Sequence, residues 1–203
     1  MSGRRSTRRG PSRFRPEAIA PVVTELDAPL TIGLISDTHM FEDGDRWVAD
    51  PIVALFHRFQ VGLIAHLGDI VGRRIIDQLK EIAPILAVQG NNDEGELTSL
   101  PLRWELRVGP HRILLLHGHG GTSARATAAL AAPGYDCVVY GHSHRPIIER
   151  VGSTLMVNPG SPTDRRFTPH FGIGILNVGV ERIEPELLLF NRPEELNRFD
   201  PRP

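Results

Sequence analysis

Five short motifs rich in histidine, aspartate, asparagine and glycine each follow directly on an apolar run of the chain. In chain order they are Asp37-x-His39, Gly68-Asp69, Gly90-Asn91-x-Asp93, His117-x-His119 and Gly141-His142-x-His144. The apolar runs have the length of buried strands, and in open α/β sheets ligand sites collect at the carboxyl ends of strands. The motifs therefore predict a fold in which polar side chains far apart in the chain meet at the edge of a sheet.

Segments with apolar residues at helical spacing lie between the apolar runs of the first half. The expected strands are Leu30–Ile35, Val61–Leu67 and Ile85–Gln89, and the expected helices are Trp47–Phe59 and Arg73–Ile82. Strands that alternate with helices in this way predict right-handed crossovers and parallel strands.

The second half of the chain consists mainly of expected strands paired around turns. A helix over Thr122–Ala132 and a strand over Asp136–Tyr140 separate the first pair from the other two. The two halves together predict an α/β protein with two sheets that face each other and helices outside. The expected pairs are Arg103–Val108 with Arg112–His117, Ile147–Val151 with Thr154–Asn158, and Phe171–Val178 with Arg182–Phe190.

Both ends of the chain have the composition of tails. Residues 1–28 carry arginines between serine, glycine and proline and show no periodic apolar face, which predicts a disordered tail. We interpret this tail as a solvated extension or a misplaced start codon rather than a basic arm for nucleic acid. Residues 192–203 are rich in proline and charge, and we expect them to fray. The folded domain is accordingly expected over residues 29–191.

The overall composition indicates which partners and which cellular compartment to expect for the protein. A chain of 203 residues with a formal net charge of −1 suits one globular domain without a global attraction to nucleic acid or anionic membranes. A single cysteine, Cys137, excludes an internal disulfide and is typical of a reducing compartment. With no apolar run of membrane-spanning length and no secretory signal, we expect a cytoplasmic protein without a membrane partner.

The residue types in the motifs indicate metal chemistry. Carboxylate and carbonyl oxygens bind hard divalent ions, and imidazole adds affinity for Mn, Fe, Co, Ni or Zn. Glycine before Asp69, Asn91 and His142 allows a close approach of the backbone, so that a side chain can be aimed into a crowded site. Each motif alone is common turn chemistry. The prediction rests on the occurrence of all five in sequence, each after an apolar strand.

This ordered set resembles the calcineurin-like metallophosphoesterase superfamily. The pattern D-x-H, G-D, G-N-x-D/E, H and G-H-x-H runs through residues 37–144. The compact length and the turn Asn158-Pro159-Gly160-Ser161 resemble the small single-domain branch typified by the YfcE phosphodiesterases. The resemblance covers roughly residues 30–190 and implies a four-layer α/β/β/α sandwich of two mixed sheets with flanking helices.

The resemblance also implies a role for individual residues. It implies that the protein binds two divalent metal ions drawn from Mn, Fe, Ni, Co or Zn as cofactors. The implied substrate is a small-molecule phosphodiester or phosphomonoester. The bond would be hydrolysed by a hydroxide that bridges the two ions, with Asp69 and Asn91 in the catalytic centre. The implied ligands are Asp37, His39 and His144 for the first ion, Asn91, His117 and His142 for the second, and Asp69 as the bridge between both.

The third motif departs from the family pattern at Asn92, where family members often carry histidine or cysteine. Histidine there is the usual candidate to protonate the leaving group, and asparagine cannot titrate. We therefore predict a preference for good leaving groups, or an acid supplied from elsewhere, with His119 or His66 as substitutes. His119 alternatively contacts substrate or is a loop histidine, and His66 alternatively is a satisfied core histidine.

Three further polar residues have open roles. Asp93 is expected either to orient Asn91 or a histidine from behind, or to cap a turn. Arg165 and Arg166 could bind substrate phosphate, although a solvated pair is the favoured interpretation.

Two alternative functions remain beside the metal-dependent hydrolase. The first is a catalytically silent scaffold of the same fold that binds a protein partner, which we rank lower because all seven expected ligand positions are filled. The second is a nuclease aided by the arginine-rich tail, for which nucleic acid would be the partner and binding would depend steeply on salt.

Overall fold

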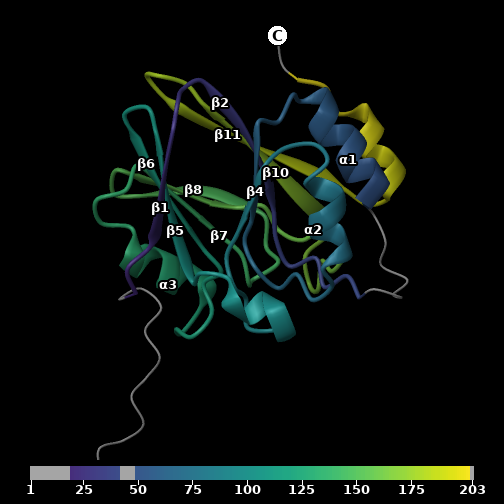
Figure 1. Ribbon diagram of the computed structural model, residues 1–203, viewed down its shortest axis with the longest axis horizontal. Helices are drawn as coiled ribbons and strands as arrows, with labels where there is room; N and C mark the ends of the chain where they lie inside the picture. The colour runs from purple at the N-terminus through teal and green to yellow at the C-terminus, as the bar shows by residue number, and fades with distance from the viewer. Residues whose placement is uncertain (1–18, 42–48, 202–203) are drawn as a thin grey trace, which may run out of the picture.

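The computed structural model describes residues 19–41 and 49–201, which form two β-sheets packed face to face (Figure 1). The expected beginning of the first helix at Trp47 lies outside these residues, as do residues 1–18 of the expected tail. No helix in the described ranges is long and apolar enough to cross a membrane.

The first sheet has five strands in the order β11-β10-β2-β3-β4. The crossovers of the first half make β2, β3 and β4 parallel, as their alternation with helices predicts, while β10 and β11 pair as an antiparallel hairpin beside β2. The sheet is therefore mixed. Its strands are β2 (Leu30–Ile35), β3 (Leu63–His66), β4 (Ile85–Ala87), β10 (Phe171–Val178) and β11 (Ile183–Phe190).

The second sheet has six strands in the order β1-β5-β6-β7-β9-β8. The sheet combines parallel pairs (β1 with β5, β6 with β7, β7 with β9) with the antiparallel hairpins β5–β6 and β8–β9. All three expected hairpins are thus present. The strands are β1 (Val22–Leu26), β5 (Arg103–Val108), β6 (His111–Leu116), β7 (Cys137–Tyr140), β8 (Ile147–Val151) and β9 (Thr154–Asn158).

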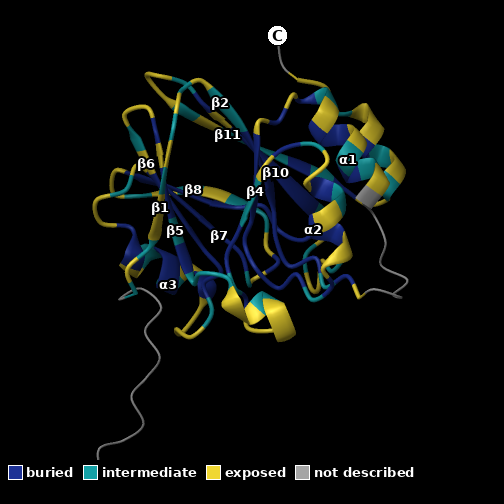
Figure 2. Ribbon diagram, viewed as in Figure 1, coloured by how far each residue is buried: buried dark blue, intermediate teal, exposed yellow. Residues whose placement is uncertain are grey.

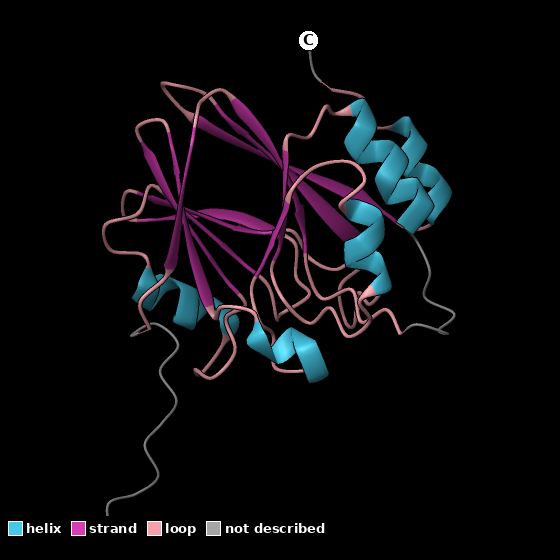
Figure 3. Ribbon diagram, in the orientation of Figure 1, coloured by secondary structure: helices cyan, strands magenta, loops and turns pink. Residues whose placement is uncertain are grey.

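Helices cover the outer face of each sheet (Figure 3). One cluster of buried hydrophobic residues fills the space between the sheets. A second cluster lies between the first sheet and its helices, and a third lies between the second sheet and its helix (Figure 2). The predicted four-layer α/β/β/α sandwich is confirmed. The helices are α1 (Ala49–Arg58), α2 (Arg74–Leu79) and the 3-10 segment η3 (Pro193–Arg198) on one side, α3 (Ala124–Ala131) on the other, and a short 3-10 segment η2 (Gly95–Ser99).

Helix α1 shows how the sequence pattern sets the packing. Ile52, Leu55, Phe56 and Phe59 recur at helical spacing, and all four are buried. Gly33 in β2 leaves room for this face, because a Cβ there would lie 2.9 Å from the ring of Phe56. The helix therefore lies directly on the first sheet beside the strand that leads into the first motif.

The expected end of the N-terminal tail at residue 28 is wrong for residues 22–26. This segment forms β1, which pairs in parallel with β5 from Val22 to Leu26. The indole N–H of Trp104 also donates a hydrogen bond of 2.8 Å to the hydroxyl of Thr24. The partner strand lies about 80 positions later in the chain, so the local composition did not reveal the pairing.

The expected fraying from residue 192 is also wrong. Residues 193–198 form η3, which packs on α1 with Leu196 fully buried. The guanidinium of Arg58 donates hydrogen bonds of 2.7 Å to the carbonyl of Leu196 and 3.0 Å to that of Phe199. The buried side chain of Leu196 and the hydrogen bonds from Arg58 thus help to hold a segment whose composition is typical of a loop.

Candidate metal centre

The five motifs meet where parallel strands of both sheets end. Loops after β2, β3 and β4 leave one sheet, and loops after β6 and β7 leave the other (Figure 1). The backbone N–H of Asp37 donates to the carbonyl of Gly68 at 2.9 Å, and that of His39 donates to Asp69 at 3.1 Å. In the second sheet, Gly141 N–H donates to the carbonyl of His117 at 3.1 Å. The backbone therefore holds the motifs against one another in pairs.

Five of the expected ligands have a left-handed backbone. The φ angles are 52° at Asp37, 43° at His39, 55° at Asp69, 66° at His142 and 55° at His144. Residues other than glycine adopt this region rarely and at an energetic cost, and such residues cluster at functional sites. The surrounding fold therefore forces these side chains out of the strand direction and into one place.

Glycines permit this crowding at two points. A Cβ at Gly90 would lie 2.2 Å from the backbone nitrogen and from Oδ1 of Asp69, and a Cβ at Gly141 would lie 2.0 Å from the hydroxyl of Ser36. No side chain fits in either place without movement of the loop behind it. These glycines are needed for the close approach of the loops that carry the motifs.

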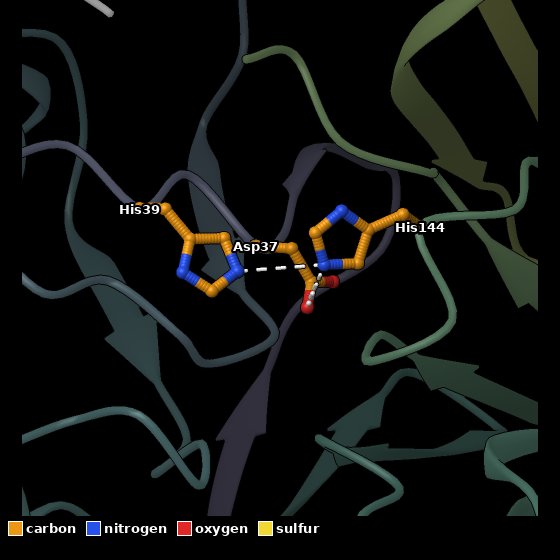
Figure 4. Close-up of side chains that lie close together, drawn as sticks. All are labelled: Asp37, His39 and His144. Carbon is orange, nitrogen blue, oxygen red and sulfur yellow. Dashed lines mark hydrogen bonds and ion pairs between the residues drawn. The ribbon is translucent and has the colours of Figure 1, made fainter. Parts of the chain in front are cut away.

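Asp37, His39 and His144 form the first group of potential ligands. The Nε2 atoms of His39 and His144 lie 3.4 Å apart, and Nε2 of His144 lies 3.3 Å from Oδ1 of Asp37. Figure 4 shows the ring nitrogens of the two histidines directed at each other, with the carboxylate of Asp37 beside them. Asp37 and His144 are fully buried.

Asp69, His117 and His142 form the second group. The Nε2 atom of His117 lies 3.4 Å from Oδ1 of Asp69 and 3.2 Å from Oδ1 of Asn91. The other oxygen of Asp69, Oδ2, lies 3.6 Å from Nε2 of His39 in the first group. The carboxylate of Asp69 thus lies between the two groups.

Hydrogen bonds at Nδ1 fix the orientation of one histidine in each group. Nδ1 of His117 lies 2.6 Å from the carbonyl of Leu67, and Nδ1 of His144 contacts the carbonyl of Asp164. A carbonyl only accepts, so each Nδ1 carries a proton, and the Nε2 atom of each ring faces the carboxylates. Backbone carbonyls orient metal-binding histidines in the same way.

Some buried acceptor atoms of the two ligand groups face each other with no donor between them in the described part of the chain, and a bound cation would satisfy them. Within the described residues, Oδ1 of Asp37 and Nδ1 of His142 are buried and have no hydrogen-bond donor. A buried polar atom without a partner costs free energy, and a shared positive charge removes that cost. The carboxylate, amide and imidazole donors fit divalent metal ions of the kind that accept mixed oxygen and nitrogen ligands.

The carboxylates remain ionised in spite of their burial. Burial raises the pKa of Asp37, but the nearby imidazoles of His144 and His117, together with the hydroxyl of Ser36, outweigh it, so that the pKa is lowered overall. The pKa of Asp69 is lowered in the same way, by His117 and by the donors of Asn92. Burial lowers the pKa of His117, yet the carboxylates of Asp69 and Asp37 raise it overall. The site is therefore built to attract positive charge.

Burial favours the neutral form of the outer histidines, His39 and His142. The pKa of His39 is lowered mainly by burial, against the carboxylates of Asp69 and Asp37. The pKa of His142 is lowered by burial first and then by the charge of His117, with Arg166 acting in the same direction. A neutral imidazole keeps the lone pair that a metal ligand requires.

The side chain of Asn92 is directed at the carboxylate of Asp69. Its backbone N–H donates 2.8 Å to Oδ1 of Asp69 and its side-chain amide donates 2.6 Å to Oδ2. Both bonds hold the carboxylate that separates the two groups. Asn92 is therefore a positioning residue for Asp69.

Asp93 caps backbone N–H groups, as the turn-cap alternative expected, and does not support Asn91 or a histidine. One of its oxygens accepts from Ile70 N–H at 2.6 Å and Val71 N–H at 3.1 Å, and the other accepts from Gly90 N–H at 2.7 Å and Asp69 N–H at 3.1 Å. The carboxylate thus joins the loop after β3 to the loop after β4. It fixes the backbone at Asp69, and this contact between distant loops could not be read from a turn-like sequence.

His66 is a structural histidine. Its Nδ1 accepts from Gly68 N–H at 3.2 Å, so Nε2 carries the proton and donates to the hydroxyl of Thr38 at 3.1 Å. That hydroxyl donates to the carbonyl of Ile70 at 3.2 Å. Burial lowers the pKa of His66 to about 4. Both ring nitrogens are used within the fold, so His66 is the satisfied core histidine that the sequence favoured and not a substitute for the missing acid.

His119 lies beside the second group. Its ring centroid is 5.3 Å from that of His117 and 6.4 Å from that of His142, and the side chain is half-buried. Burial, followed by the charges of His117 and His142, lowers its pKa to about 4. Of the two substitutes for the missing acid, only His119 lies next to the expected ligands.

The turn after β9 supports the centre from behind. The hydroxyl of Ser161 donates to the carbonyl of Asp37 at 2.7 Å, and the amide of Asn158 donates to that of Gly141 at 2.9 Å. Asp164 provides the carbonyl that orients His144. The sequence marked this turn only through its resemblance to a family pattern, and these supporting contacts were not foreseen.

Known proteins resemble this chain both in sequence and in fold. The model of the calcineurin-like phosphoesterase superfamily domain matches residues 30–180. A probable metallophosphoesterase of Methanocaldococcus jannaschii is 35% identical over 152 residues, which cover 72% of this chain and 76% of the relative. Phosphodiesterase YfcE of Escherichia coli K12 is 27% identical over 146 residues, which cover 62% of this chain and 76% of YfcE. The crystal structure of Vps29 from Chaetomium thermophilum has the same fold, with a TM-score of 0.65 and 24% identity over 81% of this chain and all of that one.

Proposed function

Because the chain belongs to the calcineurin-like phosphoesterase superfamily, we propose that it is a hydrolase of phosphodiester bonds that depends on two divalent metal ions. The observation that carries the proposal is the position of Asp69. One carboxylate oxygen faces His117 at 3.4 Å and the other faces His39 at 3.6 Å. A carboxylate shared by two ligand groups offsets the repulsion between two neighbouring cations.

The proposal assigns ligands as the family resemblance implies. Bound divalent ions would supply the charge that lowers the pKa of a water molecule and that stabilises the negative charge on the phosphoryl oxygens. The mixed donor set accepts Mn, Fe, Co, Ni or Zn, so availability decides the native ion. The ligands would be Asp37, His39 and His144 for one ion, Asn91, His117 and His142 for the other, and Asp69 for both.

The residues of the chain have three separate tasks in this reaction. Asp69 stays ionised over the working pH range because its pKa is lowered. Asn92 holds that carboxylate in place through two hydrogen bonds. The carbonyls of Leu67 and Asp164 hold His117 and His144 in the tautomer that leaves Nε2 free to bind. These contacts preorganise the site before substrate arrives.

The proposed substrate is a small-molecule diester with a good leaving group. A phosphodiesterase among the relatives supports the diester over the monoester. Asn92 cannot donate a proton to the leaving oxygen, so an alcohol that leaves as a stable anion should react fastest. We propose a cytoplasmic location, as the sequence suggested.

The test is hydrolysis by protein stripped of metal, with each divalent ion added back separately. Bis-p-nitrophenyl phosphate and p-nitrophenyl phosphate report diesterase and monoesterase activity. We expect restored activity that is greater on the diester, and loss of at least about a hundredfold in Asp69→Asn. Asp77→Asn, an exposed carboxylate on α2, is the matched control and should retain the activity. Inactivity with every ion would favour the silent scaffold.

A further inference from the structure

A groove of about 510 Å³ opens beside the candidate metal centre. This volume is in the range of small-molecule sites. It lies between the loop that carries His142 and His144 and the loop after the Asn158–Ser161 turn. Among its lining residues are Ser143, Arg145, Pro146, Arg166, Phe167 and Leu189.

The groove is tied to the centre by specific contacts. Ser143 stands between two expected ligands, and its hydroxyl accepts a hydrogen bond of 3.1 Å from the amide of Asn158. Asp164, whose carbonyl orients His144, accepts the backbone N–H of Arg166 at 3.1 Å through its carboxylate. A molecule in the groove is therefore next to the first ligand group, so the groove is a natural extension of the reaction site.

Two arginines in the groove have no partner within the described part of the chain. The guanidinium groups of Arg145 and Arg166 make no ion pair and no hydrogen bond there, and no carboxylate lines the groove. The neighbouring Arg165 is different: it donates 2.7 Å to the carbonyl of Pro169 and lies over the ring of Phe171. The structure thus separates a structural arginine from two that are available to an anion.

The groove also presents an apolar face. The side chain of Phe167 is fully exposed at its rim, while Pro146 and Leu189 contribute apolar walls. The loop is held in shape because Thr168 donates its N–H at 2.9 Å and its hydroxyl at 2.7 Å to the carbonyl of Arg165. An aromatic ring held in water beside a catalytic site is suited to stack on a flat ligand.

We infer that this groove binds one organic group of the phosphodiester, and that this group has the chemistry of a nucleotide: a flat ring with a further anionic group. The inference rests on the proposed function and names the substrate class of the same site. Arg145 and Arg166 bind the second anion, and Phe167 stacks on the ring. Guanidinium groups recognise phosphate through several parallel hydrogen bonds, which favours phosphate as that anion.

The direct test measures binding rather than turnover. Isothermal titration compares thymidine 3′,5′-bisphosphate with thymidine 5′-phosphate, once with Mn²⁺ and once in EDTA. We expect a preference of about tenfold or more for the bisphosphate in at least one condition, since charge-assisted hydrogen bonds from guanidinium to phosphate are among the stronger ones. Arg145→Met or Arg166→Met should reduce the preference to about threefold or less. The control Arg182→Met, at the far end of β10, should preserve it.

The ring is tested with the same bisphosphate lacking its base. We expect the wild-type protein to bind the thymidine compound more tightly than the abasic one, and Phe167→Leu to remove the difference, since a base stacks on an aromatic ring and leucine offers none. Equal binding of bisphosphate and monophosphate in both conditions, or a preference that survives both arginine substitutions, would overturn the inference. If the protein is inactive with every ion and still prefers the bisphosphate, the groove binds a nucleotide but the proposed hydrolase activity is wrong.

Discussion

The side-chain amide of Asn92 donates a hydrogen bond of 2.6 Å to Oδ2 of Asp69, the carboxylate that lies between the two ligand groups. The backbone N–H of the same residue donates 2.8 Å to Oδ1. Both carboxylate oxygens are therefore fixed by one residue. The position where family members often carry an acid for the leaving group is occupied here by a residue that orients Asp69.

The first prediction concerns the dependence of rate on the leaving group. In the wild-type protein, the logarithm of kcat/KM for aryl phosphodiesters should fall steeply as the pKa of the leaving phenol rises, because Asn92 provides no proton. Asn92→His should make the slope shallower. Asn92→Ala separates the loss of the hydrogen bond to Asp69 from the gain of an acid, since it removes the bond and adds no acid. It should lower kcat/KM about tenfold at an unchanged slope. The same slope in all three proteins would show that position 92 has no part in protonation.

The second prediction concerns Asp93, which accepts four backbone N–H groups from the loops after β3 and β4. In Asp93→Asn, an NH₂ group replaces one of the two accepting oxygens and leaves buried donors unpaired. We expect the free energy of unfolding to fall by about 3 kcal/mol, measured by urea denaturation in EDTA. The exposed Asp77→Asn should change it by less than about 0.5 kcal/mol. A similar small change for Asp93→Asn would mean that the two loops do not depend on this carboxylate.

The third prediction concerns Glu105 and the pH dependence of stability. The hydrogen bond from Arg112, with those from Arg107 and Tyr135, outweighs burial and lowers the pKa of Glu105 to about 2. Because the folded protein holds the ionised form, the stabilisation is fully present above the ordinary pKa of 4.5 and is lost as the pH falls towards 2. Glu105→Gln should therefore cost about 1–2 kcal/mol at pH 7, a modest value because both arginines are half-exposed.

The measurement for Glu105 is a series of urea denaturations from pH 7 down to pH 3. The difference between Glu105→Gln and the wild-type protein should narrow below pH 4.5. Glu184→Gln, in which an exposed ion pair with Arg182 is lost, provides the control and should have little effect at any pH. A constant difference across the whole series would contradict the assigned role of the charge.

The fourth prediction tests the C-terminal segment. Leu196 is fully buried against α1, so Leu196→Ala should lower the free energy of unfolding by about 2–4 kcal/mol. Leu130→Ala on α3 removes the same atoms from an exposed position and should change stability by less than about 0.5 kcal/mol. Equal stability of the two variants would mean that residues 193–198 are not part of the folded unit.

The sequence was sufficient where structure depends on local pattern. Apolar runs and helical spacing predicted the strands around the centre and the helices on both sides, and the order of the motifs predicted where the polar side chains meet. It was insufficient where a contact joins distant segments. The strand at Val22–Leu26 depends on β5, and Leu196 depends on α1, and neither partner is close in the chain.

The roles of adjacent polar residues were the hardest to predict. Asn92 and Asp93 follow one another, yet the first holds the carboxylate of Asp69 and the second holds backbone N–H groups. Arg165 and Arg166 are also neighbours, and the contacts of Arg165 with the carbonyl of Pro169 and the ring of Phe171 separate their roles. In each pair the direction of the side chain is set by the other loops of the site, so no local rule could assign it.

The most direct test of the account is the number of metal ions that bind per chain. Metal-free protein is titrated with Mn²⁺, and the bound metal is counted by elemental analysis for the wild-type protein, Asp69→Asn and Asp77→Asn. We expect two ions for the wild-type protein and Asp77→Asn, and weaker binding of both in Asp69→Asn, because the carboxylate of Asp69 lies 3.4 Å from Nε2 of His117 and 3.6 Å from Nε2 of His39. Absence of bound metal, or two ions held with unchanged affinity in Asp69→Asn, would contradict it.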